Sequence, residues 1–240
     1  MNTNPHRQTK FIDLGLIDYQ KALDFQTDLY DQLLAIKAEN RIRGADGQKT
    51  TGNFLIFCEH PHVFTLGRSG DEHNLLIRKE ELSTIDARYY SINRGGDVTY
   101  HGPGQIVVYP VLDLENFFTD IHRYMRLLEE SVIQTLQDFN IEAGRIQGLT
   151  GVWLDQEHQK AARKIAALGV KTSRWVTLHG LSFNVNTDLS YFDYIIPCGI
   201  PDKGVTSMKL EKGVEQDLNA VKEILKKKLV TLFEMELVYV

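Results

Sequence analysis

The chain has 240 residues, of which 42% are hydrophobic, and a formal net charge of -5. This length and apolar content allow one large domain or two small ones with a sizeable core. No stretch approaches the roughly 20 apolar residues of a membrane span, the polar start is unlike a secretory signal, and the acidic balance disfavours nucleic acid.

Predicted helices and strands follow one another along the whole chain. Helices are expected where apolar residues recur at three- and four-residue steps behind a capping aspartate, and strands where apolar residues run together or alternate with polar ones. In chain order they are a strand at 11–15, a helix at 19–40 after Asp18, a strand at 54–58, a helical turn or two at 80–85, strands at 89–92 and 106–112, a helix at 121–139 after Asp120, strands at 151–154, 163–170 and 176–186, a helix at 218–232 after Asp217, and a closing strand at 233–240. No composition break marks a linker, so we expect a disordered N-terminus over 1–10 and one α+β domain over 11–240.

Three local predictions concern the first half of the chain. Cys58 ends a continuous apolar run and is expected to be a small core residue in a strand buried on both faces. Pro110 is expected to end the strand at 106–112. His60 and His62 flank a proline on a turn, where two solvated histidines are favoured over a metal site because no third ligand is near.

A glycine-rich segment, residues 94–105 (RGGDVTYHGPGQ), carries the strongest chemical signal. Its four glycines and one proline let the backbone turn sharply and let a ligand approach closely. The pattern predicts a strand, a Gly-Gly bend, a short polar strand, a tight turn and a second strand, which together line a groove with exposed backbone N–H groups. A plain hairpin is the alternative, but it would not require Arg94, Tyr100, His101 and Gln105 within the same few residues.

This segment resembles the signature of the lipoyl(octanoyl) transferases, RGG-x-x-T-Y/W-H-G-P-G-Q, and matches it without a break. Three more segments are similar to the same family: E-H-x-x-V-x-T-x-G-R at 59–68, K-I-A/G-x-[LI]-G at 164–169 and P-C-G at 197–199. The resemblance extends from about Phe54 to Met208. It implies an α+β fold like that of the biotin and lipoate protein ligase catalytic domains, a mixed β-sheet flanked by helices.

A cysteine and a lysine form the second predicted constellation. Cys198 follows a proline in a predicted loop, and a thiol with a pKa of about 8.5 needs a cation or a base to ionise. Taken alone, Cys198 is better explained as a buried loop cysteine. Lys164 enters an otherwise apolar strand, where a lysine must pair, snorkel or change its protonation. The resemblance implies that Cys198 carries an acyl thioester and that Lys164 lowers its pKa.

The resemblance also implies which residues border the substrate. They are Arg94, Gly95, Gly96, Asp97, Val98, Thr99, Tyr100 and His101 in the glycine-rich segment, and Ala167, Leu168, Gly169, Gly180, Leu181 and Ser182 in two later strands. His179 begins a segment similar to the family's H-G-x-[AS]-[LF]-N, but it is equally well explained as a structural strand residue.

The function implied is octanoyl transfer from octanoyl-acyl carrier protein to a lysine of lipoyl domains, those of 2-oxoacid dehydrogenases and of glycine cleavage H protein. The donor thioester is already activated, so no nucleotide, cofactor or metal is expected. The two distant cysteines predict reduced thiols, and so a cytoplasmic protein.

Two alternatives stay open. An ATP-dependent lipoate ligase shares the glycine segment and the lysine but lacks the P-C-G cysteine. A binding module for acyl carrier protein would need Cys198 to be inert.

Overall fold

The computed structural model describes residues 5–43, 47–158, 161–197 and 203–239. The helices are α1 (Tyr19–Ile42), α2 (Ile121–Asp138), α3 (Met208–Lys212) and α4 (Leu218–Phe233). The strands are β1 (Gln8–Leu16), β2 (Phe54–Glu59), β3 (Val63–Leu66), β4 (Arg88–Ser91), β5 (Thr99–His101), β6 (Gln105–Val111), β7 (Gly144–Ile146), β8 (Leu149–Leu154), β9 (Arg163–Ser173), β10 (Val176–Asn184), β11 (Gly204–Val205) and β12 (Glu236–Tyr239).

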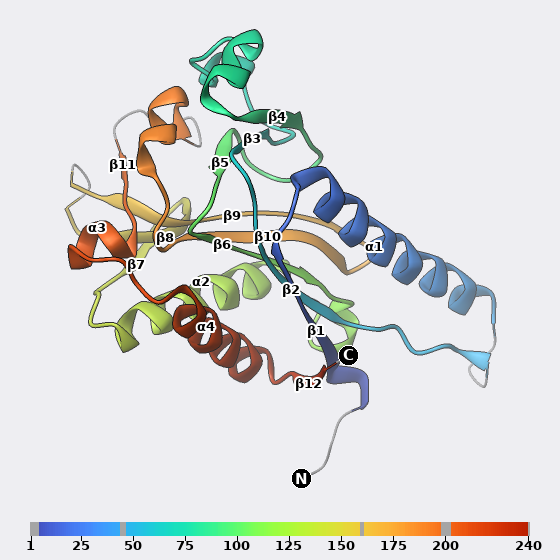
Figure 1. Ribbon diagram of the computed structural model, residues 1–240. Helices are drawn as coiled ribbons and strands as arrows, with labels where there is room; N and C mark the ends of the chain where they lie inside the picture. The colour runs from blue at the N-terminus through green and yellow to red at the C-terminus, as the bar shows by residue number, and fades with distance from the viewer. Residues whose placement is uncertain (1–4, 44–46, 159–160, 198–202, 240) are drawn as a thin grey trace.

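The strands form a large mixed sheet and a small one. The large sheet has nine strands in the order β12-β1-β2-β6-β10-β9-β8-β7, with β11 beside β9. Strand β1 runs parallel to β12 and β2, whereas β2, β6, β10, β9 and β8 pair antiparallel. The small sheet has the order β4-β3-β5 and lies above the large sheet in Figure 1. The predicted mixed sheet flanked by helices is confirmed.

Helices cover both faces of the large sheet, with α1 on one side and α2 and α4 on the other (Figure 1). Successive residues of a strand point to opposite faces. In β2, Leu55 and Phe57 therefore join the cluster under α2 and α4, while Ile56 and Cys58 pack against α1. The prediction of a strand buried on both faces, with Cys58 as a core residue, is confirmed.

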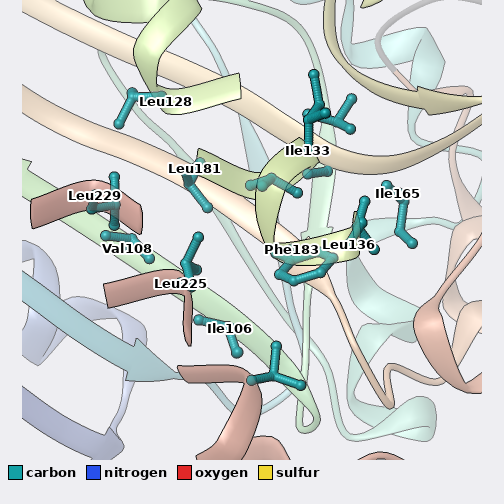
Figure 2. Close-up of a cluster of buried hydrophobic side chains, with 14 of the residues drawn as sticks. Ile106, Val108, Leu128, Ile133, Leu136, Ile165, Leu181, Phe183, Leu225 and Leu229 are labelled. Carbon is teal, nitrogen blue, oxygen red and sulfur yellow. The ribbon is translucent and has the colours of Figure 1, made fainter. Parts of the chain in front are cut away.

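The core under α2 and α4 fixes the three central strands. Figure 2 shows Ile106 and Val108 of β6 and Leu181 and Phe183 of β10 facing Leu225 and Leu229 of α4 and Leu128 and Leu136 of α2. Each of these side chains is at most 2% exposed. A core packed this tightly gives β6 and β10 little freedom to shift, so it holds the opposite face of the same strands in place.

The three predicted helix caps are confirmed. The carboxylate of Asp18 accepts from Gln20 N and Lys21 N, that of Asp120 from Arg123 N, and that of Asp217 from Asn219 N and Ala220 N. The predicted helical turns at 80–85 form a 3-10 helix over Lys79–Ile85.

Several predicted boundaries are wrong. Residues 8–10 are part of β1, where Thr9 is fully buried and pairs with Leu237 of β12, so their predicted disorder is wrong. Pro110 lies inside β6, paired with Leu55 of β2, and does not end the strand. Pairing of β6 with β10 stops at Val108, so the missing N–H of Pro110 costs no bond to that strand.

Three further differences concern strands whose existence or first residue was not predicted from the sequence. The short strands β7 and β11 were not predicted at all. The closing strand begins only at Glu236, because α4 continues to Phe233 and ends in a left-handed residue, Glu234.

Candidate active site

The glycine-rich segment lies between β4 and β6 and is held by close backbone approaches. A Cβ added to Gly67 would lie 2.2 Å from the carbonyl oxygen of Gly96, and one added to Gly169 would lie 2.7 Å from that of Gly95. Only glycine lets backbones come so near. The N–H of Gly95 also donates to the carbonyl of Val170 at 3.0 Å, so the segment is fastened to β9.

Arg94 braces the bend of this segment. Its side chain is buried, and Nη2 donates to the carbonyl of Asp97 at 2.8 Å and to the carbonyl and hydroxyl oxygens of Thr65 at 2.8 and 3.0 Å. The rigid fork of guanidinium donors suits such convergent oxygens. Arg94 therefore ties the glycine-rich segment to β3 of the small sheet.

Successive side chains of residues 97–101 point in alternate directions, and this decides which of them can contact a substrate. Asp97, Thr99 and His101 line a large cavity. Val98 and Tyr100 point the other way, into a cluster with Phe64 and the 3-10 helix over Leu189–Tyr194, where the Tyr100 ring stacks on Tyr191. Val98 and Tyr100, both predicted to border the substrate, thus support the segment from behind.

The large cavity lies between the glycine-rich segment and the sheet; its volume is about 50 Å³, or about 490 Å³ when all the space up to the surrounding atoms and the open solvent at its mouth are included. The predicted substrate-bordering residues that line it are Arg94, Gly96, Asp97, Thr99, His101, Ala167, Leu168, Gly169, Gly180, Leu181 and Ser182. Gly95 is the remaining predicted residue, and its backbone lies against β9 instead. The floor is made of strands β6, β9 and β10, and two of its positions are glycines, which leaves room above the sheet.

A small cavity adjoins the large one and contains Lys164. The two cavities share Thr99, Ala167 and Ser182 as lining residues. Lys164 is 7% exposed. Pro197, the last described residue before Cys198, also lines this small cavity. Cys198 itself lies outside the described residues.

Lys164 is positioned by β8. It pairs with Trp153, and its Nζ lies 4.6 Å from the centre of the Trp153 ring. A Cβ added to Gly151 would lie 3.2 Å from Cε of Lys164, so the lysine stem occupies space that this glycine leaves. The face of the Trp153 ring attracts the ammonium group, and Gly151 leaves room for the lysine side chain. Together they direct Lys164 toward the small cavity.

A chain of hydrogen bonds fixes the state of His101. Gln105 donates through Nε2 to the carbonyl of Tyr100 and to Oδ1 of Asn184, so its Oε1 must be the acceptor at 2.7 Å from Nδ1 of His101. His101 therefore carries its proton on Nδ1 and keeps Nε2 as an acceptor. Burial, and next the neighbouring His60, lower the pKa of His101 to about 3, so the ring is neutral at physiological pH.

The expectation of two solvated histidines beyond β2 is wrong. His60 is fully buried, with Nδ1 2.9 Å from the carbonyl of Ile17 and Nε2 2.8 Å from the Tyr109 hydroxyl, and burial lowers its pKa. His62 stacks on Tyr191 at 4.1 Å between ring centres. In the described ranges no three His, Cys, Asp or Glu side chains are grouped as metal ligands would be.

Four cavity residues were not predicted as substrate-bordering: Tyr19, Val107, Tyr109 and His179. Tyr19 and Tyr109 come from the apolar stripe of α1 and from a buried strand, where a site residue looks like any core residue. His179 carried a signal in its H-G motif, but no feature of the sequence shows that its φ is +64°.

The fold defines the class of enzyme. The bi-partite lipoate protein ligase of Thermoplasma acidophilum has the same fold, with a TM-score of 0.66 and 16% identity, over 98% of this chain and 87% of that chain. A family model described as the lipoyl protein ligase A/B catalytic domain matches residues 18–230. The class is therefore that of lipoyl-group ligase and transferase catalytic domains.

Curated relatives narrow this class. The chain is 55% identical to the octanoyltransferase of Cytophaga hutchinsonii, over 99% of this chain and 97% of the relative. It is 54% identical to the octanoyltransferase of Flavobacterium johnsoniae, over 97% of this chain and all of the relative. The chain belongs to the octanoyltransferase family and is an acyltransferase. Across the described residues, no helix has the length and apolar content that crossing a membrane requires.

Proposed function

We propose that this enzyme moves an octanoyl group from octanoyl-acyl carrier protein to a lysine of lipoyl domains, through a thioester on Cys198. The acceptors are the lipoyl domains of 2-oxoacid dehydrogenases and the glycine cleavage H protein. The observation that supports this most directly is the junction of the two cavities. The small one brings Lys164 beside Pro197, the residue before Cys198, and it shares Ala167 and Ser182 with the large cavity.

In the first step the Cys198 thiolate attacks the carbonyl carbon of the donor thioester. The carrier's sulfur leaves with the electron pair of the broken C–S bond and takes a proton from Lys164, so one thioester replaces another and Lys164 is left neutral. Lys164 acts as the cation that favours the thiolate. Backbone N–H groups of the glycine-rich segment or of the Cys198 loop hold the oxyanion of the tetrahedral intermediate.

In the second step the neutral amine of the acceptor lysine attacks the acyl-enzyme. The C–S bond to Cys198 breaks, an amide forms, and Lys164 accepts the proton that the amine loses. The route from thioester to thioester to amide runs downhill, so it needs no nucleotide. A nucleophilic thiol also requires reducing surroundings, in line with a cytoplasmic location.

The large cavity suits the hydrocarbon part of the substrate. Val107 and Ala167 line its floor, while Gly169 and Gly180 add no side chains that would fill it. Burying each CH₂ of an acyl chain is worth about 0.8 kcal/mol, so most of the affinity for the acyl group comes from this floor.

Intact-mass spectrometry after incubation with octanoyl-acyl carrier protein tests the proposal. The mass should rise by one octanoyl group in the wild type and in Cys58→Ser, and stay unchanged in Cys198→Ala. Cys58 is a suitable control because it is buried, and burial raises the pKa of its thiol. Label on Cys58 would overturn the assignment of the nucleophile. Strict dependence on ATP with free octanoate as donor, in a Cys198→Ala protein that is still active, would instead favour a ligase.

A further inference from the structure

A connecting segment, residues 68–75, joins the glycine-rich segment to the stretch of chain that precedes the proposed nucleophile. At its start, the N–H of Arg68 donates to the carbonyl of Arg94 at 2.9 Å. At its end, Leu75 forms an antiparallel bridge with Ile195. The connecting segment therefore contacts both the wall of the large cavity and the chain that leads into the small one.

Asn74, the last residue of a short 3-10 helix, contacts both sides at once. Its Nδ2 donates to Oδ2 of Asp97 in the glycine-rich segment at 2.5 Å. Its backbone carbonyl accepts from the N–H of Ile196 at 2.8 Å. The residue after Ile196 is Pro197, which lines the small cavity. One residue thus spans the gap between the acyl cavity and the chain that enters the cavity of Lys164.

The carboxylate of Asp97 gives this contact a fixed geometry. Asp97 lines the large cavity, and its Oδ1 accepts from the N–H of Val98 at 2.6 Å and from that of Asp71 at 3.2 Å. Oδ2 is the oxygen that accepts from Asn74. A carboxylate only accepts, so the Asn74 amide must present Nδ2, and the resulting bond is of the strong, charge-assisted kind.

Other contacts hold the parts that this bond connects. The glycine-rich segment is fastened to β3 through Arg94 and to β9 through the N–H of Gly95. On the far side of the nucleophile in sequence, Val205 of β11 pairs with Lys164 of β9. Loss of the Asn74 side-chain bond would leave these anchors intact. It would change only how residues 195–197 sit relative to the glycine-rich segment.

We propose that Asn74 is a positioning residue for acyl transfer. Through Asp97 it aligns residues 195–197 with the glycine-rich segment, so that the Cys198 thiolate meets the carbonyl carbon of an acyl group held in the large cavity. Asn74 takes no part in bond making, and the inference rests on the proposed function. The family resemblance does not imply this role, because Asp97 stands at an x position of the signature and Asn74 lies outside every similar segment.

Two variants break the bond and restore it. Asn74→Asp places a second carboxylate opposite Asp97, and the two like charges repel each other. Asn74→Asp combined with Asp97→Asn exchanges donor and acceptor. The introduced amide keeps an oxygen for the N–H groups of Val98 and Asp71, and its NH₂ group donates to the introduced carboxylate. The double variant therefore recovers the contact without recovering the original residues.

Three measurements at pH 8 separate alignment from the integrity of each part. They are single-turnover acylation by octanoyl-acyl carrier protein, alkylation of Cys198 by iodoacetamide, and the Kd for octanoic acid. In Asn74→Asp we expect acylation to slow by about tenfold or more, because a displacement of about 1 Å can cost a hundredfold in rate, while the other two values stay within about threefold of the wild type. The double variant should recover most of the lost rate. Asn219→Asp, at an exposed position of α4, should match the wild type in all three measurements.

Each other outcome contradicts the positioning role. Acylation of Asn74→Asp at the wild-type rate would overturn it, as would a double variant that recovers nothing. Equal losses in all three measurements would mean that the connecting segment only supports the fold. If Asn74→Asp does not fold, Asn74→Ala, which keeps the backbone carbonyl that accepts from Ile196, should show the same selective loss of acylation. A wild-type protein that is not acylated would contradict the proposed function itself, and the positioning role with it.

Discussion

The Nζ atom of Lys164 lies 4.6 Å from the centre of the Trp153 ring, across the β8–β9 pairing that joins their backbones. The ring fixes one side of the lysine and Gly151 makes room for its stem. A long, flexible side chain therefore enters the small cavity in one orientation. Such prior ordering suits the role proposed for Lys164 toward the thiol of Cys198.

Lys164→Ala should raise the pH at which Cys198 reacts with iodoacetamide. Removing a nearby cation disfavours the thiolate, and we expect the midpoint to rise by about one pH unit, which corresponds to about 1.4 kcal/mol. Alkylation rates followed by peptide mass spectrometry between pH 6 and 10 measure the shift. Lys21→Ala, which removes an exposed lysine on α1, is the control. Identical profiles for Lys164→Ala and the wild type would exclude this role for Lys164.

Gly169→Ala should abolish most of the octanoyl transfer while the protein stays folded. The new methyl would lie 2.7 Å from the Gly95 carbonyl oxygen and 3.0 Å from Cδ of Arg94, so the glycine-rich segment must move off β9. We expect kcat/KM to fall at least tenfold, with an unchanged far-ultraviolet circular dichroism spectrum. Gly47→Ala is the matched control, since its Cβ would meet nothing closer than 3.7 Å. Full activity in Gly169→Ala would show that the segment does not need this position.

The free energy of unfolding should fall as the pH drops below about 6.5. The pKa of His101 is about 3 in the folded protein, against an ordinary value near 6.5 in the unfolded chain. Between these values only the unfolded chain binds the proton, so each such histidine removes up to about 1.4 kcal/mol of stability per pH unit. The stabilising contribution is complete above pH 6.5 and declines toward pH 3.

Urea unfolding of His101→Gln between pH 7 and pH 4 tests this dependence. The slope of unfolding free energy against pH should be smaller than in the wild type by about one proton. His122→Gln, at an exposed position of α2, should keep the wild-type slope. An unaltered slope in His101→Gln would mean that the ring takes up a proton as easily in the fold as outside it.

Glu129→Gln should destabilise the fold by about 2–3 kcal/mol, because a fully buried carboxylate with three donors would lose its charge-assisted bonds. Its oxygens accept from Gly151 N at 3.0 Å, Arg126 at 2.6 Å and Arg145 at 2.9 Å. Chemical denaturation measures the change. Glu130→Gln, which affects a partly exposed ion pair with Arg145, should cost less than about 1 kcal/mol. Equal costs for the two variants would contradict the special role of Glu129.

Regular helices and central strands could be predicted because their causes are local. Asp18, Asp120 and Asp217 each stand before an apolar stripe, and β2 is a short apolar run bounded by polar residues. The edges could not be predicted in the same way. Strand β11 has only two residues and exists because β9 pairs with it, and Gln8 and Thr9 become a strand only because they pair with β12.

The candidate site also has a part that could be predicted from local sequence and a part that could not. Motif similarity located the glycine-rich segment, Lys164 and most of the cavity floor. Tyr19, Val107, Tyr109 and His179 escaped prediction as cavity residues because the cavity joins residues distant in sequence, and because the positive φ of His179 is a property of the folded chain. The short strand was predicted, but which of its faces turns away from the cavity, with Tyr100 packed on Tyr191, is visible only in the fold.

The first strand of the chain forms its ladder with the last one, from Gln8 beside Glu236 to Phe11 beside Tyr239. During synthesis, β1 leaves the ribosome more than two hundred residues ahead of its partner. Until residues 236–239 have been synthesised, the nascent chain presents an unpaired strand edge at the side of β1 that β12 later covers, which is a place where another chain could add. Synthesis of β12 is therefore the step that protects this edge of β1.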